Sequence, residues 1–275
     1  MELHLGDKRA LVLASSKGLG RASATELVRE GARVVISSRS EGNLETARDA
    51  ILEETGADPD RVVPVTCDLS DPVAIPDRLE AGIDELGGLD ILVTNRGGPP
   101  EQSFEESTIE DFDDIYTSVL KSTIVAVKTA LPHLLEGEDG AAITNIIATS
   151  TQEPTANHVL ANSIRPGVYG FSKSLSSEYG REDLRVNCVT PRGIWTERAE
   201  RRQEKFGDPD GDLSAEEARE RNIERLVLST SDHALDRYAD PAEFGRVVAF
   251  VSSAAASYVT GEVIDVDGGW SRQLI

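Results

Sequence analysis

The chain has 275 residues, with 49 acidic and 28 basic side chains and a formal net charge of −21. Such a charge argues against nucleic acid or an anionic membrane as a partner, because both bind basic surfaces. The sequence holds no apolar run long enough to span a membrane and no secretory signal pattern at its start. These features predict a cytoplasmic protein. The acidic surface is consistent with a salt-loving organism or with an ordinary acidic cytosolic protein.

The cysteine and histidine content argues against a disulfide-stabilised protein and against a metal-binding protein. The two cysteines, Cys67 and Cys188, each lie inside an apolar, strand-like run. They therefore indicate neither a disulfide framework nor a zinc site, in agreement with a cytoplasmic setting. The four histidines lack metal-ligand spacing, so we predict no metal site.

Strand and helix patterns alternate along the chain. Apolar runs predict strands over 10–14, 33–38, 61–66, 89–94, 141–148, 185–190 and 262–266. Helical patterns follow most of them, over about 22–31, 43–54, 74–86, 109–134 and a long stretch ending at Tyr179. Such alternation predicts a doubly wound parallel α/β sheet, the extended Rossmann type, in a single domain over residues 1–275.

The stretch 9–20, RALVLASSKGLG, has the order strand, glycine turn, helix. Gly18 and Gly20 allow the backbone to approach a pyrophosphate, and the following helix offers unpaired N–H groups. A glycine pair is by itself a weak signal, and a tight turn without a ligand is the alternative.

A polar stretch, about 196–240, follows the sixth predicted strand. It lies on the carboxyl side of the sheet, where ligands bind in such folds. The sequence leaves two interpretations open, a segment that covers a substrate and a solvated helical insertion.

Several segments together resemble the short-chain dehydrogenase/reductase family over nearly the whole chain. Residues 14–20 resemble the TGxxxGxG turn, with Ala14 in place of the first glycine. Asp68 in CDLSD matches an adenine-contacting acid, and TNRG at 94–97 stands where the family has NNAG. The RVN at 185–187, PRGIWT at 191–196 and ASYVTGEVIDVDGG at 256–269 are similar to the remaining family motifs.

The resemblance implies a nicotinamide cofactor held by a defined set of positions. These are Ser15, Ser16, Lys17, Gly18, Leu19, Gly20, Ser38, Arg39, Asp68, Leu69, Asn95, Gly97, Arg165, Pro191, Ile194 and Thr196. It also implies a homodimer or homotetramer. The pairing elements would be the helices over about 115–134 and 157–179 and the segment 256–275.

The end of the second strand distinguishes NADP(H) from NAD(H). An NAD site usually has a carboxylate ~20 residues beyond the glycine turn, bonded to the ribose 2′-hydroxyl. Here the residues are Ser37, Ser38 and Arg39. Arg39 and Lys17 can pair with a 2′-phosphate, which a carboxylate would repel. We predict NADP(H) rather than NAD(H).

The family's catalytic Tyr and Lys are replaced here. Counting back from RVN at 185–187 places the family Tyr at Ala161 and the family Lys at Arg165. The helix Asn falls at Val119, and the family Ser falls near Ala148 or at Ser150. We therefore predict Ser150 and Arg165 as the catalytic pair, although an arginine donates no proton at neutral pH.

A displaced pair, Tyr169 and Lys173, has the family's four-residue spacing. Tyr169 lies eight residues beyond Ala161, which on a helix is ~12 Å of rise and ~80° of rotation. It reaches the catalytic position only if the helix begins near Arg165, a start that Pro166 would favour. The alternative is a core or subunit-interface residue, which we prefer.

These observations predict an NADP(H)-dependent oxidoreductase that transfers a hydride between nicotinamide and a small carbonyl or alcohol. The proton donor would be Ser150, an ordered water or the substrate itself. The replaced Tyr, Lys and Asn support an alternative, a nucleotide-binding protein without turnover that acts as a regulator or oligomer partner.

Overall fold

The computed structural model describes residues 2–137, 139–201, 234–235 and 237–272. Within them, seven parallel strands form one sheet in the order β3-β2-β1-β4-β5-β6-β7. The strands are β1 (Arg9–Val12), β2 (Arg33–Ser38), β3 (Val62–Thr66), β4 (Ile91–Thr94), β5 (Ala141–Ile146), β6 (Leu184–Pro191) and β7 (Val263–Val266). The predicted α/β class and parallel sheet are confirmed.

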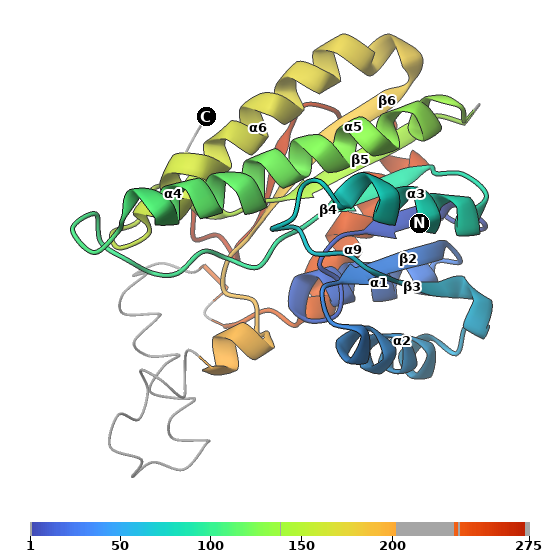
Figure 1. Ribbon diagram of the computed structural model, residues 1–275. Coiled ribbons are helices and arrows are strands. Elements are labelled where there is room, and N and C mark those ends of the chain that lie inside the picture. The colour runs from blue at the N-terminus through green and yellow to red at the C-terminus, as the bar shows by residue number, and fades with distance from the viewer. Residues whose placement is uncertain (1, 138, 202–233, 236, 273–275) are drawn as a thin grey trace.

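The helices cover both faces of this sheet (Figure 1). They are α1 (Gly18–Arg29), α2 (Glu41–Thr55), α3 (Ile75–Leu86), α4 (Ile109–Ile115), α5 (Ser122–Leu135), α6 (Val159–Tyr179) and α9 (Pro241–Ser252). One apolar cluster joins α1, α2 and α9 to alternate strand residues such as Val34 and Ile36, and a second joins α3, α5 and α6 to Val35 between them. This alternation is the period of a strand buried on both faces.

Local signals set several helix ends. Thr108 accepts from the amide of Asp111 at 3.2 Å, and the Asp111 carboxylate accepts in return from the amide of Thr108 at 2.8 Å, which forms a capping box before α4. Asp240 and Glu243 form the same box at α9. Among the described residues, none of the helices has the length and apolar character needed to cross a membrane.

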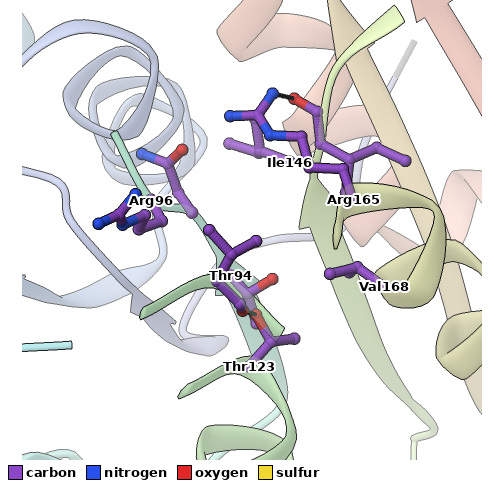
Figure 2. Close-up of a pocket in the computed structure, with 9 residues that line it drawn as sticks. Thr94, Arg96, Thr123, Ile146, Arg165 and Val168 are labelled. Carbon is purple, nitrogen blue, oxygen red and sulfur yellow. Dashed lines mark hydrogen bonds between the residues drawn. The ribbon is translucent and has the colours of Figure 1, made fainter. Parts of the chain in front are cut away.

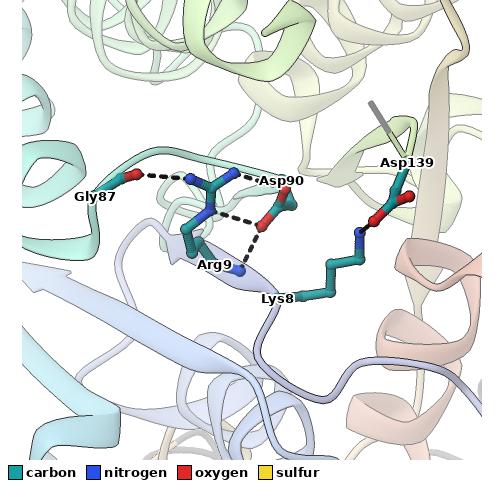
Figure 3. Close-up of polar contacts among 5 residues, drawn as sticks. All are labelled: Lys8, Arg9, Gly87, Asp90 and Asp139. Carbon is teal, nitrogen blue, oxygen red and sulfur yellow. Dashed lines mark hydrogen bonds and ion pairs between the residues drawn. The ribbon is translucent and has the colours of Figure 1, made fainter. Parts of the chain in front are cut away.

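An ion pair joins the two central strands at their amino ends. The guanidinium of Arg9, at the start of β1, donates to both carboxylate oxygens of Asp90 at 2.9 Å, just before β4 (Figure 3). The strand order reverses between β1 and β4, so the crevice beyond their opposite, carboxyl ends is where such folds bind ligands. The predicted site residues after β1, β2, β4, β5 and β6 all lie at that carboxyl edge.

Most of the predicted substrate-side insertion, 196–240, lies outside the described residues. The structure describes its first part as a helical turn over 197–201, and its last part as residues 234–235 and 237–240.

Candidate functional site

The turn between β1 and α1 has little room for side chains. Gly18 has a φ of +55°, and a Cβ on Gly20 would lie 2.4 Å from the carbonyl oxygen of Ala14. Ala14 itself has a φ of +47°, a left-handed conformation that favours glycine. The chain therefore keeps the shape of the family turn with alanine at its first position, at some backbone strain.

Two serines of this turn have different environments. Ser15 is fully buried; its hydroxyl donates to the carbonyl of Val12 at 2.7 Å and accepts from the amide of Ser37 at 2.8 Å. That hydroxyl fastens β1 to β2 inside the fold. The hydroxyl of Ser16 lies 3.1 Å from that of Ser38, so the turn and the end of β2 share one polar surface.

Charged side chains lie beside these serines. Lys17 is exposed as the N-cap residue of α1, and Arg39 is exposed directly after β2. The Asp68 carboxylate accepts from the amide of Ser70 at 2.9 Å and from its hydroxyl at 2.7 Å. These bonds, with smaller contributions from Arg39 and another nearby arginine, lower the pKa of Asp68 and keep it ionised. The 2′-phosphate and adenine positions predicted from the sequence are thus neighbours.

The ends of β4 and β6 close around the glycine turn. The Asn95 amide donates to the carbonyl of Ala14 at 3.1 Å, and a Cβ on Gly18 would lie 3.7 Å from Thr196. Ile194 is buried and bridges to Ala239. Of the remaining predicted contacts, Leu69 packs against the α3 side of the sheet, Gly97 is exposed and Pro191 ends β6.

Arg165 lies at the carboxyl end of β5. Its guanidinium donates to the carbonyl of Ile147 at 3.0 Å (Figure 2). Ser150 is buried three residues beyond Ile147, in a short 3-10 helix that packs against α6. Burial, and then repulsion from Arg198 and Arg96, lowers the pKa of Arg165 to about 10, which leaves it charged at neutral pH. The structure therefore brings the two predicted catalytic residues into one region.

A pocket beside Arg165 also contains Val119, the position where the sequence pattern places the family Asn. Its lining residues are Thr94, Asn95, Arg96, Val119, Thr123, Ile146, Ile147, Arg165 and Val168 (Figure 2). Val119 lies in a π-helical segment, Tyr116–Lys121, that interrupts the helix between α4 and α5. Such interruptions are frequent at functional sites. The carbonyl of Val119 accepts from the Thr123 hydroxyl at 2.7 Å, and its side chain is apolar.

The displaced pair lies elsewhere on α6. The helix begins at Val159, and Pro166 is inside it, so the interpretation in which it begins near Arg165 is wrong. Tyr169 packs against the apolar cluster that contains Ile115 and Val119. The Lys173 ammonium donates to the carbonyl of Gly261 at 2.8 Å, which ties α6 to the segment before β7.

Sequence reasoning missed three charged residues at this edge. Arg96 lines the pocket, and Arg198 donates to the carbonyl of Pro99 at 3.1 Å. The Glu197 carboxylate accepts from the amide of Gly18 at 3.0 Å. Residues 197 and 198 belong to the polar stretch after β6, in which no motif distinguishes one charged side chain from another.

The sheet order, the glycine turn at the switch point and the helices on both faces define a Rossmann-type α/β protein. A family model described as enoyl-(acyl carrier protein) reductase matches residues 13–271. The chain belongs to the short-chain dehydrogenase/reductase family.

Known proteins resemble the chain over 96% or more of its length. Levodione reductase from Leifsonia aquatica is 29% identical over 266 residues, which cover 96% of this chain and 94% of that protein. L-sorbose reductase from Gluconobacter frateurii, complexed with NADPH and L-sorbose, has a TM-score of 0.89, 25% identity and full coverage of both chains. An apo short-chain oxidoreductase from Pseudomonas aeruginosa PAO1, described as containing an atypical catalytic center, has a TM-score of 0.86, 27% identity and coverage of 97% and 98%.

Proposed function

We propose that this protein is an NADP(H)-dependent oxidoreductase that interconverts a carbonyl and an alcohol on a small molecule. The observation that carries the proposal is the juxtaposition, at one sheet edge, of the crowded glycine turn with Ser16, Ser38 and the start of α1. Backbone N–H groups at a helix start suit a pyrophosphate, and hydroxyls beside cationic side chains suit a further phosphate.

The residues present fit the cofactor. Gly20 has no space for a side chain because the backbone of Ala14 and Ser15 lies against it, which keeps the turn tight. Lys17 and Arg39 supply positive charge on an otherwise acidic protein. Residues Gly18, Leu19 and Gly20 would hold the pyrophosphate, and Ser38 and Arg39 the 2′-phosphate. The bound cofactor supplies or accepts a hydride. Support also comes from L-sorbose reductase, a structural neighbour complexed with NADPH.

The chain's own residues then have separate tasks. Arg165 orients groups at the end of β5, because one of its five N–H donors bonds to Ile147 and the guanidinium stays charged. Ser150 holds the reacting oxygen and is our first candidate for passing it a proton, with an ordered water and the substrate itself as alternatives. Val119 and Ala161 carry no exchangeable side-chain proton, and apolar groups there exclude water.

The same replacements favour a second function. Ala161 and Val119 are buried apolar residues where the family has Tyr and Asn. A protein that binds NADP(H) without turnover would also keep the cofactor-binding residues and lose the catalytic Tyr and Asn. Such a protein would act as a regulator or oligomer partner. A cytoplasmic setting suits both functions, since Cys67 and Cys188 are free and buried.

Titration of both cofactors, followed by NADPH oxidation with ketones, sugars and acyl thioesters, separates the two functions. The proposed enzyme binds NADPH and oxidises it with at least one carbonyl class, and Ser150→Ala lowers that rate by ~10²-fold or more. Binding without oxidation over the whole panel would favour the regulator. Absence of binding would contradict both.

A further inference from the structure

Positive charge is concentrated at one point of a protein with a net charge of −21. Arg96 and Arg165 line the same pocket, from the end of β4 and from α6 (Figure 2). Burial, and then the charges of Arg198 and Arg96, lower the pKa of Arg165. Burial, and then the charges of Arg39 and Arg198, lower the pKa of Arg96, whereas those of Asp114 and Asp68 raise it. Like charges gathered in a partly buried place are unfavourable unless an anion joins them.

Arg165 is the arginine of this group whose charge is least compensated. Its hydrogen-bond partner is a neutral carbonyl, that of Ile147 at 3.0 Å. Among the residues that the structure describes, no carboxylate pairs with it, and the charges that act on it are those of Arg198 and Arg96. A desolvated guanidinium without a counter-charge is costly, so its surroundings are complete only with an anionic ligand.

The cofactor's phosphates have their own partners on the other side of the crevice. The start of α1 would face the pyrophosphate of the proposed cofactor, and Lys17 and Arg39 flank the end of β2. Arg165, on α6, instead donates to the carbonyl of Ile147, directly after β5 and beside the helical turn that holds Ser150. The unpaired charge therefore lies at the reacting end of the site.

We propose that the substrate of the oxidoreductase carries a carboxylate, which Arg165 and Arg96 bind, so that the enzyme interconverts an oxo acid and a hydroxy acid. This inference rests on the proposed function and names its substrate class. Reduction adds a hydride to the carbonyl carbon and a proton to the carbonyl oxygen, NADPH becomes NADP⁺, and the carboxylate is unchanged. A planar guanidinium suits a carboxylate, since it can donate two parallel hydrogen bonds.

The first test uses wild-type protein loaded with NADP⁺. Calorimetric titration compares 2-oxo and 3-oxo acids with their methyl esters, which keep the carbonyl and lose the charge. We expect at least one acid to bind about 10- to 100-fold more tightly than its ester, the range for a hydrogen bond to a charged group. Equal binding of every acid and ester, or no binding of any acid, would overturn the proposal.

The second test uses Arg165→Gln, with Arg165→Lys as the charge-preserving variant and Arg39→Gln as a matched loss of one arginine at the cofactor end. Arg165→Gln should abolish the preference for the acid, and Arg165→Lys should restore part of it. Because Arg165 is also one of the predicted cofactor positions, the acid and ester of each variant are compared at saturating NADP⁺. Arg39→Gln should weaken NADPH binding and keep the acid-to-ester ratio.

If Arg165→Gln weakens NADPH and leaves the acid preference intact, the anion is a cofactor phosphate and the proposal is wrong. Circular dichroism and thermal melting verify that each variant folds, and the acid–ester comparison on wild type is independent of folding. Failure of NADPH to bind wild type would instead contradict the proposed function. The two failures are therefore distinguishable.

Discussion

The carboxylate of Glu197 accepts a hydrogen bond from the backbone amide of Gly18 at 3.0 Å, across 179 positions of sequence. Its other oxygen lies 3.8 Å from the guanidinium of Arg21, one turn into α1. The N-terminus of a helix attracts anions through its free N–H groups and its dipole. A cofactor pyrophosphate at the same helix start would therefore compete with Glu197.

We expect Glu197→Gln to bind NADPH about 2- to 5-fold more tightly than wild type, the equivalent of ~0.3–1 kcal/mol for one charge at a helix terminus. Fluorescence titration of NADPH measures the change. Glu200→Gln is the control, because Glu200 is exposed on the same helical turn. Weaker binding by Glu197→Gln would mean that Glu197 helps to hold the cofactor.

Arg39 tests the choice of cofactor. Arg39→Asp places a negative charge beside Ser38, where we expect the 2′-phosphate, and should lower NADPH affinity by about 10- to 100-fold. NADH affinity should stay the same or rise, because an acid can bond to the ribose hydroxyl. Titration of both cofactors checks this, with Arg181→Asp, an exposed arginine after α6, as control. An unchanged ratio, or a wild-type preference for NADH, would contradict it.

The sheet could be predicted because its strands are buried on both faces and read as short apolar runs. β2 was predicted with its observed bounds, Arg33–Ser38, and most other ends differ by a few residues, as strand and helix ends usually do. α9 was missed, although Asp240 and Glu243 form a capping box at its start and Phe244 and Val248 are fully buried along it. The polar stretch before it obscured that periodicity.

The site could be predicted where a backbone shape dictates the residue. Gly18 has a positive φ and Gly20 has no space for a Cβ, so both positions require glycine, and the glycines can be recognised in the sequence. The contact between Glu197 and Gly18, and the approach of Arg96 to Arg165, depend on tertiary structure alone. The π-helical segment around Val119 also lacked a signal, since its residues fit an ordinary helix.

The ion pair between Arg9 and Asp90 should make stability depend on pH (Figure 3). Burial opposes ionisation of Asp90, but the hydrogen bonds and charge of Arg9 outweigh it and lower the Asp90 pKa below 3.8. A carboxyl with a lowered folded-state pKa stabilises the protein above its unfolded-state pKa, and this contribution is lost as pH falls through the folded-state value.

Asp90→Asn should therefore lower the free energy of unfolding by ~1–3 kcal/mol at neutral pH, and the difference should shrink at acid pH. Urea unfolding from about pH 7 to pH 3 measures it. Asp139→Asn is the control: Asp139 pairs with Lys8 at 3.3 Å but its side chain is 85% exposed, so we expect at most about 0.5 kcal/mol. Equal effects of the two variants would contradict the role of Asp90.

We predict a homo-oligomer, a dimer or a tetramer, that pairs through the helices α4–α5 and α6. Tyr116, between α4 and α5, is 46% exposed for a large aromatic residue. Light scattering in dilute buffer and in molar salt tests this, because salt screens repulsion between acidic chains. Tyr116→Glu should shift the protein toward monomer, and Val73→Glu, at a position 86% exposed, should not. A monomer under both salt conditions would contradict the prediction.

Tyr169 is, in our prediction, not the catalytic acid despite its spacing with Lys173. It packs among the apolar side chains around Ile115, whereas Lys173 is bonded to Gly261. Tyr169→Phe should keep NADPH affinity and stay within about 3-fold of wild-type activity, because loss of a true general acid costs ~10²–10⁴ in rate.

Lys173→Met, which loses the bond to Gly261, should lower stability by ~1 kcal/mol and leave the activity of the folded fraction intact. Steady-state rates of both variants, compared with Ser150→Ala, decide whether Ser150 with Arg165 or Tyr169 with Lys173 is the catalytic pair. A rate loss of a hundredfold or more in Tyr169→Phe, with the fold and NADPH affinity retained, would assign the proton transfer to Tyr169 and exclude Ser150.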